Sequence, residues 1–132
     1  MTRDEWRKEL GRRSEEVAAA FLQKAGYCVV ARNCNFRVGE LDLVVSSGET
    51  LVVVEVRSAS TSYLATPGIT VNRTKQRKIV RATQVFLRRS GLGYMRLRFD
   101  VVAVQWKGGE ASVQWFRDAF RPESSAQAVS FR

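Results

Sequence analysis

The stretch GELDLVVSSGETLVVVEVR, from Gly39 to Arg57, constrains the fold of this chain more than any other. Its two apolar runs flank SSGE, whose glycine permits the positive backbone angle that tight hairpin turns need. The sequence therefore predicts two antiparallel strands here. A chain that only builds a core would not place charge at the ends of these strands. Four charged residues nevertheless stand there: Glu40, Asp42, Glu55 and Arg57.

Strand geometry gathers these four charges. Successive side chains of a strand point to opposite faces, so Glu40 shares a face with Asp42, and Glu55 shares one with Arg57. If residue i of the first strand faces residue j of the second and i + j is odd, the even positions 40 and 42 lie on the same face as the odd positions 55 and 57. A sum of 97 sets Asp42 opposite Glu55 with a two-residue turn, and a sum of 95 also keeps the pairs together. The antiparallel return places all four at one end of the sheet.

Three carboxylates this close repel one another, and burying one unpaired costs several kcal/mol. A divalent cation offsets that cost, and Mg2+ prefers oxygen ligands, including one or two protein carboxylates. Asp42 and Glu55 fit this role, with the main-chain carbonyl of Val56 as a further ligand and Glu15 and Glu40 as additional candidates. Mn2+ is the expected substitute. The alternative is that these charges form ordinary cross-strand ion pairs at a sheet edge.

The remaining chain alternates helix and strand signals. A helix is predicted over residues 2–25, with Thr2 as its cap and Gly26 as its stop, followed by a strand and a turn at Asn33 to Asn35. A second helix is predicted over residues 72–89, and two strands, RLRFDVVAVQW and SVQWF, follow across KGGE. The order α-β-β-β-α-β-β predicts an α/β fold with a mixed central β-sheet flanked by helices. We expect one domain over residues 1–120, a loop over 58–70 and a disordered tail over 121–132.

Chemical roles can be assigned to Glu15 and Arg57 from their positions and side chains. Glu15 falls on the side of the first helix that carries Ala18 and Leu22, so it is expected to face the sheet, whereas Glu16 falls beside Gln23. Arg57 can form bidentate bonds to a phosphate, but its pKa is too high for it to act as a general base.

The charge balance points to a polyanionic partner. Lys and Arg number 22 against 13 Asp and Glu, a net charge of +9, which favours nucleic acid or an acidic membrane surface. Contacts to phosphates give salt-dependent, sequence-independent binding. The alternative is a solvated helix face. The candidate nucleic-acid-binding residues are Arg12, Arg13, Arg37, Arg73, Lys75, Arg77, Lys78 and Arg81.

Composition also excludes several classes of site. The chain has no histidine, which rules out a Ser-His triad and a His general base. Its two cysteines, Cys28 and Cys34, form no CxxC pair and are expected to be free thiols. The first residues lack the apolar run of a signal peptide, and no 18 apolar residues occur in succession, so we expect a cytoplasmic protein with no membrane partner.

The spacing of Asp42, twelve intervening residues and Glu55-Val56-Arg57 resembles the D…(D/E)xK signature of the PD-(D/E)XK nuclease superfamily, which includes Holliday junction resolvases. More narrowly, six segments resemble successive blocks of the YraN-like family of predicted endonucleases, over roughly residues 10–120. The segments are GRRSEEVAAAFLQKAGY, ARNCNFRVGELDLVV, LVVVEVRS, VNRTKQRKIVRATQVFL, RFDVVAV and WFRDAF.

This resemblance implies a restriction-endonuclease-like core and a Mg2+-dependent hydrolase that cuts DNA phosphodiesters. By analogy with junction resolvases, it implies branched or junction DNA recognised by shape rather than sequence, and a homodimer, because two symmetric strands need two sites. The alternatives are a catalytically silent nucleic-acid-binding module with the same fold and, more weakly, a protein-interaction adaptor.

The resemblance also assigns residues. Carried over by position, Glu15 is the helix acid, Asp42 and Glu55 are the metal carboxylates, and Lys75 matches a lysine that meets substrate phosphate. Arg57 departs from the pattern, because it stands at the position of the signature lysine and puts lysine-type base chemistry in doubt. Asp100, in the RFDVV block, is either a functional acid or a buried, hydrogen-bonded one.

Overall fold

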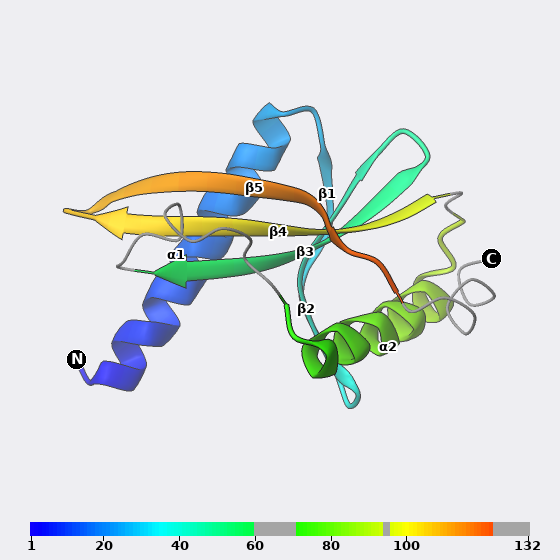
Figure 1. Ribbon diagram of the computed structural model, residues 1–132, viewed down its shortest axis with the longest axis horizontal. Coiled ribbons are helices and arrows are strands. Elements are labelled where there is room, and N and C mark those ends of the chain that lie inside the picture. The colour runs from blue at the N-terminus through cyan, green and yellow to red at the C-terminus, as the bar shows by residue number, and fades with distance from the viewer. Residues whose placement is uncertain (60–70, 94–95, 123–132) are drawn as a thin grey trace.

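The computed structural model describes residues 1–59, 71–93 and 96–122. Most of the expected loop and nearly all of the expected tail lie outside the described residues. Seven elements follow one another along the chain (Figure 1): α1 (Arg3–Lys24), β1 (Cys28–Phe36), β2 (Gly39–Ser47), β3 (Thr50–Ala59), α2 (Arg73–Ser90), β4 (Arg96–Lys107) and β5 (Glu110–Phe120). The predicted order of elements is confirmed.

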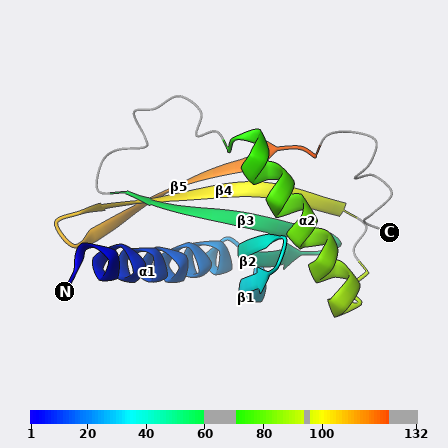
Figure 2. The ribbon, with the colours of Figure 1, turned by 90° about the horizontal axis from the view of Figure 1, so that it is seen from below.

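The five strands form one sheet in the order β1-β2-β3-β4-β5, in which β3 and β4 run parallel and all other neighbours are antiparallel. In Figure 2, α2 crosses the strands and α1 runs along the lower left of the sheet, and the two separate apolar clusters show that the helices cover opposite faces. Each helix covers its own apolar cluster: Ala18 and Leu22 of α1 pack on Val52 and Val54, whereas Ile79 and other residues of α2 pack on the opposite face. The predicted mixed α/β sheet flanked by helices is therefore confirmed.

Both helices begin at the residues that their sequences favour. The Thr2 hydroxyl accepts a hydrogen bond from the Glu5 N–H at 3.1 Å, and the Glu5 carboxylate accepts one from the Thr2 N–H at 3.2 Å. The Asn72 side chain caps α2 by accepting from the Lys75 N–H at 2.9 Å. Such caps satisfy N–H groups that the helix itself leaves unpaired. Among the helices of the described residues, none is long and apolar enough to cross a membrane.

The central hairpin has the register whose paired numbers sum to 97. Its ladder runs from Leu43 opposite Val54 to Ser47 opposite Thr50, which leaves a two-residue turn whose glycine, Gly48, has a φ of 58°. Only a positive φ of this kind closes so short a turn, which is why glycine stands there.

Regular pairing between β2 and β3 ends at Leu43, which faces Val54. The next residue of β2 away from the hairpin turn is the candidate acid Asp42, and it lies beyond the ladder. Leu43 packs in the α1 cluster, whereas Leu41 packs in the α2 cluster. Residues two apart on a regular strand share a face, so alternation breaks at Asp42. The strand that carries the acid therefore turns away from its neighbour at the acid itself.

The turn expected at Asn33 to Asn35 is wrong. The strand β1 continues to Phe36, which pairs with Gly39, so the chain reverses at Arg37 and Val38 instead. Asn33 does have a positive φ of 49°, but within the strand. Asparagine is among the few residues other than glycine that tolerate this conformation, so a local bend was mistaken for a turn.

The start of β2 touches the backbone of α2. A Cβ atom added to Gly39 would lie 2.7 Å from the carbonyl oxygen of Lys78, closer than such atoms approach in proteins. Glycine at this position therefore permits the β1–β2 turn to rest directly on the helix.

Replacing Gly39 with alanine should force the turn away from α2. Because the obstacle is a main-chain carbonyl and not a movable side-chain end, we expect the free energy of unfolding to fall by about 1–3 kcal/mol. Urea denaturation of Gly39→Ala measures this, with Gly11→Ala as the matched control, since no atom lies within 4 Å of the added Cβ there. An equal or smaller loss in Gly39→Ala than in the control would contradict the close contact.

Candidate functional site

Asp42 and Glu55 meet where β2 parts from β3. The Asp42 Oδ2 atom accepts a hydrogen bond from the main-chain N–H of Val56 at 3.0 Å, so the side chain takes the place that a β2 carbonyl would hold in a regular ladder. The side chain of Glu55 is only 11% exposed and acts as a hydrogen-bonding partner of Asp42. Two carboxylates and the backbone of Val56 are therefore brought together at one point of the sheet.

This crowding alters the titration of Glu55. Burial, and then the negative charge of Asp42 and the hydrogen bond between the two carboxyl groups, raise the pKa of Glu55 to about 7. Lys75 and Arg57 act in the opposite direction through their positive charge, but do not restore the ordinary value. The carboxylate pair is thus short of compensating charge, which is the condition under which a cation binds.

The lysine nearest to this pair comes from the second helix. Lys75, in the first turn of α2, places its Nζ atom 3.5 Å from the Glu55 Oε2 atom. The resemblance associated this lysine with substrate phosphate, whereas in the structure it is also an ion-pair partner of a candidate ligand. Because Arg57 stands at the signature lysine position, Lys75 gives the site a lysine from a different element.

Glu15 approaches the pair from the opposite helix. It is half-buried, while Glu16 is exposed and pairs with Arg12 at 2.7 Å, in agreement with the helical spacing. Burial and the charge of Asp42 raise the pKa of Glu15, a hydrogen bond with Asn33 opposes this shift, and Glu40 adds to it. The structure therefore brings Glu15, Glu40 and Asp42 into one electrostatic neighbourhood.

Asn33 is the residue of this neighbourhood that was not among the candidates. Its positive φ of 49° and its hydrogen bond with Glu15 place an unusual backbone conformation beside a candidate acid. Residues held in sparsely populated conformations cluster at functional sites. The asparagines in ARNCN carried this signal, because asparagine is enriched at positive φ, but the sequence did not tell which of them would adopt it.

The donor set suits Mg2+ better than a metal that needs a full protein cage. Within residues 1–59, 71–93 and 96–122, no group of three or more His, Cys, Asp or Glu side chains is placed to hold a metal ion together. Mg2+ is usually held by only one or two carboxylates and keeps several waters. Asp42 and Glu55 supply two such oxygen ligands, and the uncompensated charge of Glu55 fits a divalent partner. The expected wider set, with Glu15 and Glu40, is not assembled as a ready cage.

The predicted cations fall into separate groups. Arg12 pairs with Glu9 and Glu16 on the exposed side of α1, and the guanidinium of Arg13 stacks over the Trp106 ring at 4.7 Å. The cations of α2 belong to the N-terminal half of that helix, which covers the opposite face of the sheet from α1. That group consists of Arg73, Lys75, Arg77, Lys78 and Arg81, and all five are exposed. Of the α2 group, Lys75 stands beside the carboxylate pair, 3.5 Å from Glu55.

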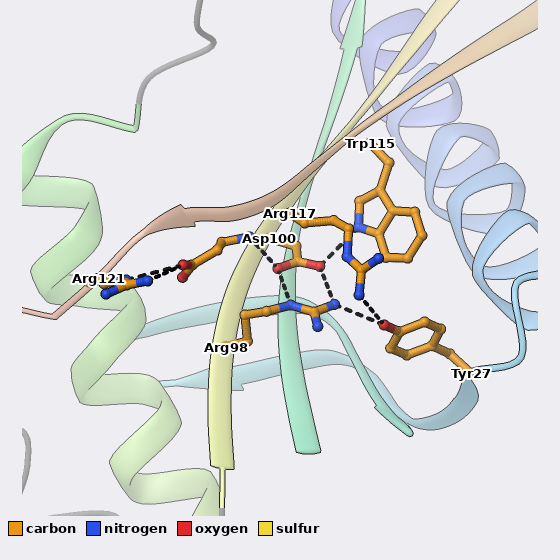
Figure 3. A network of polar contacts seen from close by, with 7 residues as sticks. Tyr27, Arg98, Asp100, Trp115, Arg117 and Arg121 are labelled. Carbon is orange, nitrogen blue, oxygen red and sulfur yellow. Dashed lines mark hydrogen bonds and ion pairs between the residues drawn. The ribbon is translucent and has the colours of Figure 1, made fainter. Parts of the chain in front are cut away.

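Asp100 is committed to a structural network (Figure 3). Its fully buried carboxylate accepts two hydrogen bonds from Arg98, both at 2.8 Å, one from the Trp115 Nε1 atom at 2.9 Å and one from the Asp118 N–H at 2.9 Å. Arg98 also donates to the Tyr27 hydroxyl at 3.0 Å. The pairing of β4 with β5 is irregular between Phe99 and Val101. Asp100 therefore fastens the bulge in β5 and is a hydrogen-bonded, buried acid.

The sequence is similar to proteins of one family. The profile described as Uncharacterised protein family UPF0102 matches residues 14–104. A UPF0102 protein of Desulfosudis oleivorans is 41% identical over 114 residues, covering 86% of this chain and 91% of that protein. A UPF0102 protein of Desulforapulum autotrophicum is 38% identical over 117 residues, covering 89% and 97%. One of Geobacter sulfurreducens is 41% identical over 97 residues, covering 74% and 76%.

Glu55→Gln should stabilise the metal-free protein at high pH. A carboxyl group whose pKa rises from 4.5 to about 7 on folding weakens the fold as the pH rises through that window, because the native state then holds a proton that the unfolded state has lost. Glutamine removes this repulsion, so in EDTA we expect a gain of about 1–3 kcal/mol at pH 8 and little change at pH 4.5. Urea denaturation at both pH values, with Glu49→Gln as the control, measures it. A loss of stability equal at both pH values would contradict the raised pKa.

Asp100→Ala should destabilise the fold strongly. Removing the carboxylate leaves Arg98, whose side chain is only 20% exposed, without its partner, and breaking such a pair costs about 3–5 kcal/mol. Thermal or urea unfolding of this variant tests the prediction beside Glu110→Ala, which changes an exposed acid at the start of β5. If both variants unfold alike, the network does not hold the two strands together.

Proposed function

The chain belongs to the uncharacterised protein family UPF0102, and from its own site we propose that it is a Mg2+-dependent deoxyribonuclease that hydrolyses DNA phosphodiesters, with branched DNA as the preferred substrate. The observation that carries this proposal is the carboxylate pair of Asp42 and Glu55, buried enough to raise the pKa of Glu55 to about 7 and flanked by Lys75 and Arg57. An acid pair with cations on its rim matches the needs of a phosphodiester centre.

Each side chain has a task in this reaction. Asp42 and Glu55 would hold Mg2+, and the Val56 N–H fixes the orientation of the Asp42 carboxylate. When bound, the Mg2+ ion acts as a Lewis acid that offsets the charge developing on the phosphodiester. Arg57 holds the scissile phosphate through its guanidinium, a task that suits arginine because it cannot serve as the base.

Lys75 and Glu15 complete the proposed arrangement. Lys75, 3.5 Å from Glu55, is placed to exchange part of its ion pair for a contact with a substrate phosphate. Glu15 would accept a hydrogen bond from the attacking water, a role supported by its half-buried carboxylate in the same electrostatic neighbourhood as Asp42. The remaining cations of α2 bind the DNA backbone without reading its sequence.

One observation favours a second candidate function, a nucleic-acid-binding module that does not cleave. Arg57 replaces the lysine of the D…(D/E)xK signature, and Lys75 already supplies the Glu55 carboxylate with a positive partner. Because Lys75 and Arg57 offset part of the negative charge of Glu55, the site has less need of a metal than a carboxylate pair without such cations. This candidate shares the DNA surface with the first one and differs from it only in the reaction.

A cleavage assay separates the two candidates. Labelled four-way, flapped and linear DNA are incubated with the protein in Mg2+, in Mn2+ or in EDTA, and the products are resolved on denaturing gels. We expect metal-dependent products from the branched substrates, and a loss of at least about a hundredfold in Asp42→Asn and Glu55→Gln, since losing even a ligand's hydrogen-bond partner costs about 10- to 100-fold. Glu49→Gln is the matched control, because Glu49 is an exposed acid in the turn at the other end of the hairpin.

Two outcomes would decide against the nuclease. Tight DNA binding with no products in either metal supports the non-cleaving module. Calorimetry with Mg2+ is the complementary test, and equal, negligible heats from the unaltered protein, Asp42→Asn and Glu55→Gln would contradict the metal site itself.

A further inference from the structure

A groove runs beside the carboxylate pair, between the β1–β2 turn and the first turns of α2. Its volume is about 430 Å³, within the roughly 300–1,000 Å³ range of pockets that hold small ligands. Three cations line it, Arg37, Lys75 and Lys78, against one acid, Glu40. The groove is therefore positively charged on balance and large enough for part of a nucleotide chain.

The lining is apolar as well as cationic. Phe36 and Ile79 contribute to the wall and pack in the α2 cluster, while Val38, at the tip of the turn, is 38% exposed. An exposed valine is poorly suited to contact a phosphate, and the outer surface of a duplex, made of phosphates and sugars, does not present the broad apolar face of a base to it. Unpaired bases do, because every base has an apolar face that lies on apolar side chains.

The two walls of the groove are held in a fixed relation. Gly39 rests against the main-chain carbonyl of Lys78, with no room for a Cβ atom between them. The main chain that carries Arg37, two residues before Gly39, is thus held at a fixed distance from the main chain of Lys78 on α2. Preorganisation of this kind lowers the entropic cost of binding.

We propose that this groove binds a single strand of nucleic acid, with its phosphates on Arg37 and Lys78 and its unpaired bases against Val38. The strand continues into the carboxylate site, because Lys75 lines the groove and also lies 3.5 Å from Glu55. The continuation of the strand from the groove into the carboxylate site rests on the proposed nuclease function, because the bound segment would then adjoin the phosphodiester to be cut. The preferred branched substrates are accordingly those with an unpaired arm.

Binding without cleavage tests the groove on its own. Fluorescence anisotropy in EDTA, with the full chain, compares a 12-nucleotide single strand of mixed sequence with the corresponding 12-base-pair duplex. For the single strand, Lys78→Gln and Arg37→Gln should each weaken binding about three- to tenfold and reduce the slope of log affinity against log salt by about 0.7. Val38→Ser should weaken single-strand binding about threefold and leave duplex binding unchanged.

Lys8→Gln is the matched control, because Lys8 is an exposed cation in the half of α1 that lies far from α2 in both views (Figures 1 and 2). The altered residues Arg37, Val38 and Lys78 are all exposed, and thermal unfolding checks that each variant keeps its fold. The inference is overturned if Lys78→Gln and Arg37→Gln bind the single strand as Lys8→Gln does. It is also overturned if Val38→Ser weakens both DNAs equally or neither.

The test does not depend on catalysis. Asp42→Asn should bind the single strand in EDTA at least as well as the unaltered protein, since it removes a negative charge beside the groove. If no DNA is ever cut but the groove variants lose affinity as expected, the nuclease proposal fails and the groove stands. If DNA is cut and the groove variants bind normally, the groove proposal alone fails.

Discussion

The candidate site depends on one hydrogen bond, the contact of the Val56 N–H with the Asp42 carboxylate at 3.0 Å. Regular pairing of β2 with β3 stops at Leu43, and a partly buried main-chain N–H left without an acceptor would be costly. Asp42 removes that cost with its side chain, which permits β2 to turn away. The same departure brings Gly39 against α2 and opens the groove beside the acids. The structural and the chemical tasks of Asp42 therefore cannot be separated.

The electrostatics of the site follow from where each charge is carried. Glu55 and Arg57 belong to β3, Lys75 to α2 and Glu15 to α1, so the two faces of the sheet both contribute to one end of the hairpin. Burial makes every one of these interactions stronger than it would be in water. Lys75 and Arg57 lower the pKa of Glu55 only in part, which leaves the pair with an unmet demand for positive charge. The net basic charge of the chain is concentrated where such a demand exists, on the first turns of α2.

Local patterns predicted most of the fold. The SSGE turn and the lengths of the apolar runs were compatible with the observed hairpin register. The helices begin and end within one residue of the predicted limits, which were set from Thr2, Gly26 and Asn72. Features set by distant packing were not predictable. The contact of Lys75 with Glu55 requires α2 to dock on the sheet, where it lies chiefly against β2, and the bend at Asn33 requires the course of β2 beside it. Asp100 was ambiguous for the same reason, since two of its four hydrogen bonds come from Trp115 and Asp118 of the distant β5.

The two ladders that flank β3 differ in how soon they can form. The β2–β3 hairpin closes through two residues, whereas the parallel β3–β4 ladder requires the whole crossover that contains α2. Nearby segments pair earlier in folding than distant ones. We therefore expect Asp42 and Glu55 to approach each other before α2 docks and brings Lys75 to within 3.5 Å of Glu55. A chain in which α2 has not docked would therefore carry both acids but lack the positive charge of Lys75 beside them.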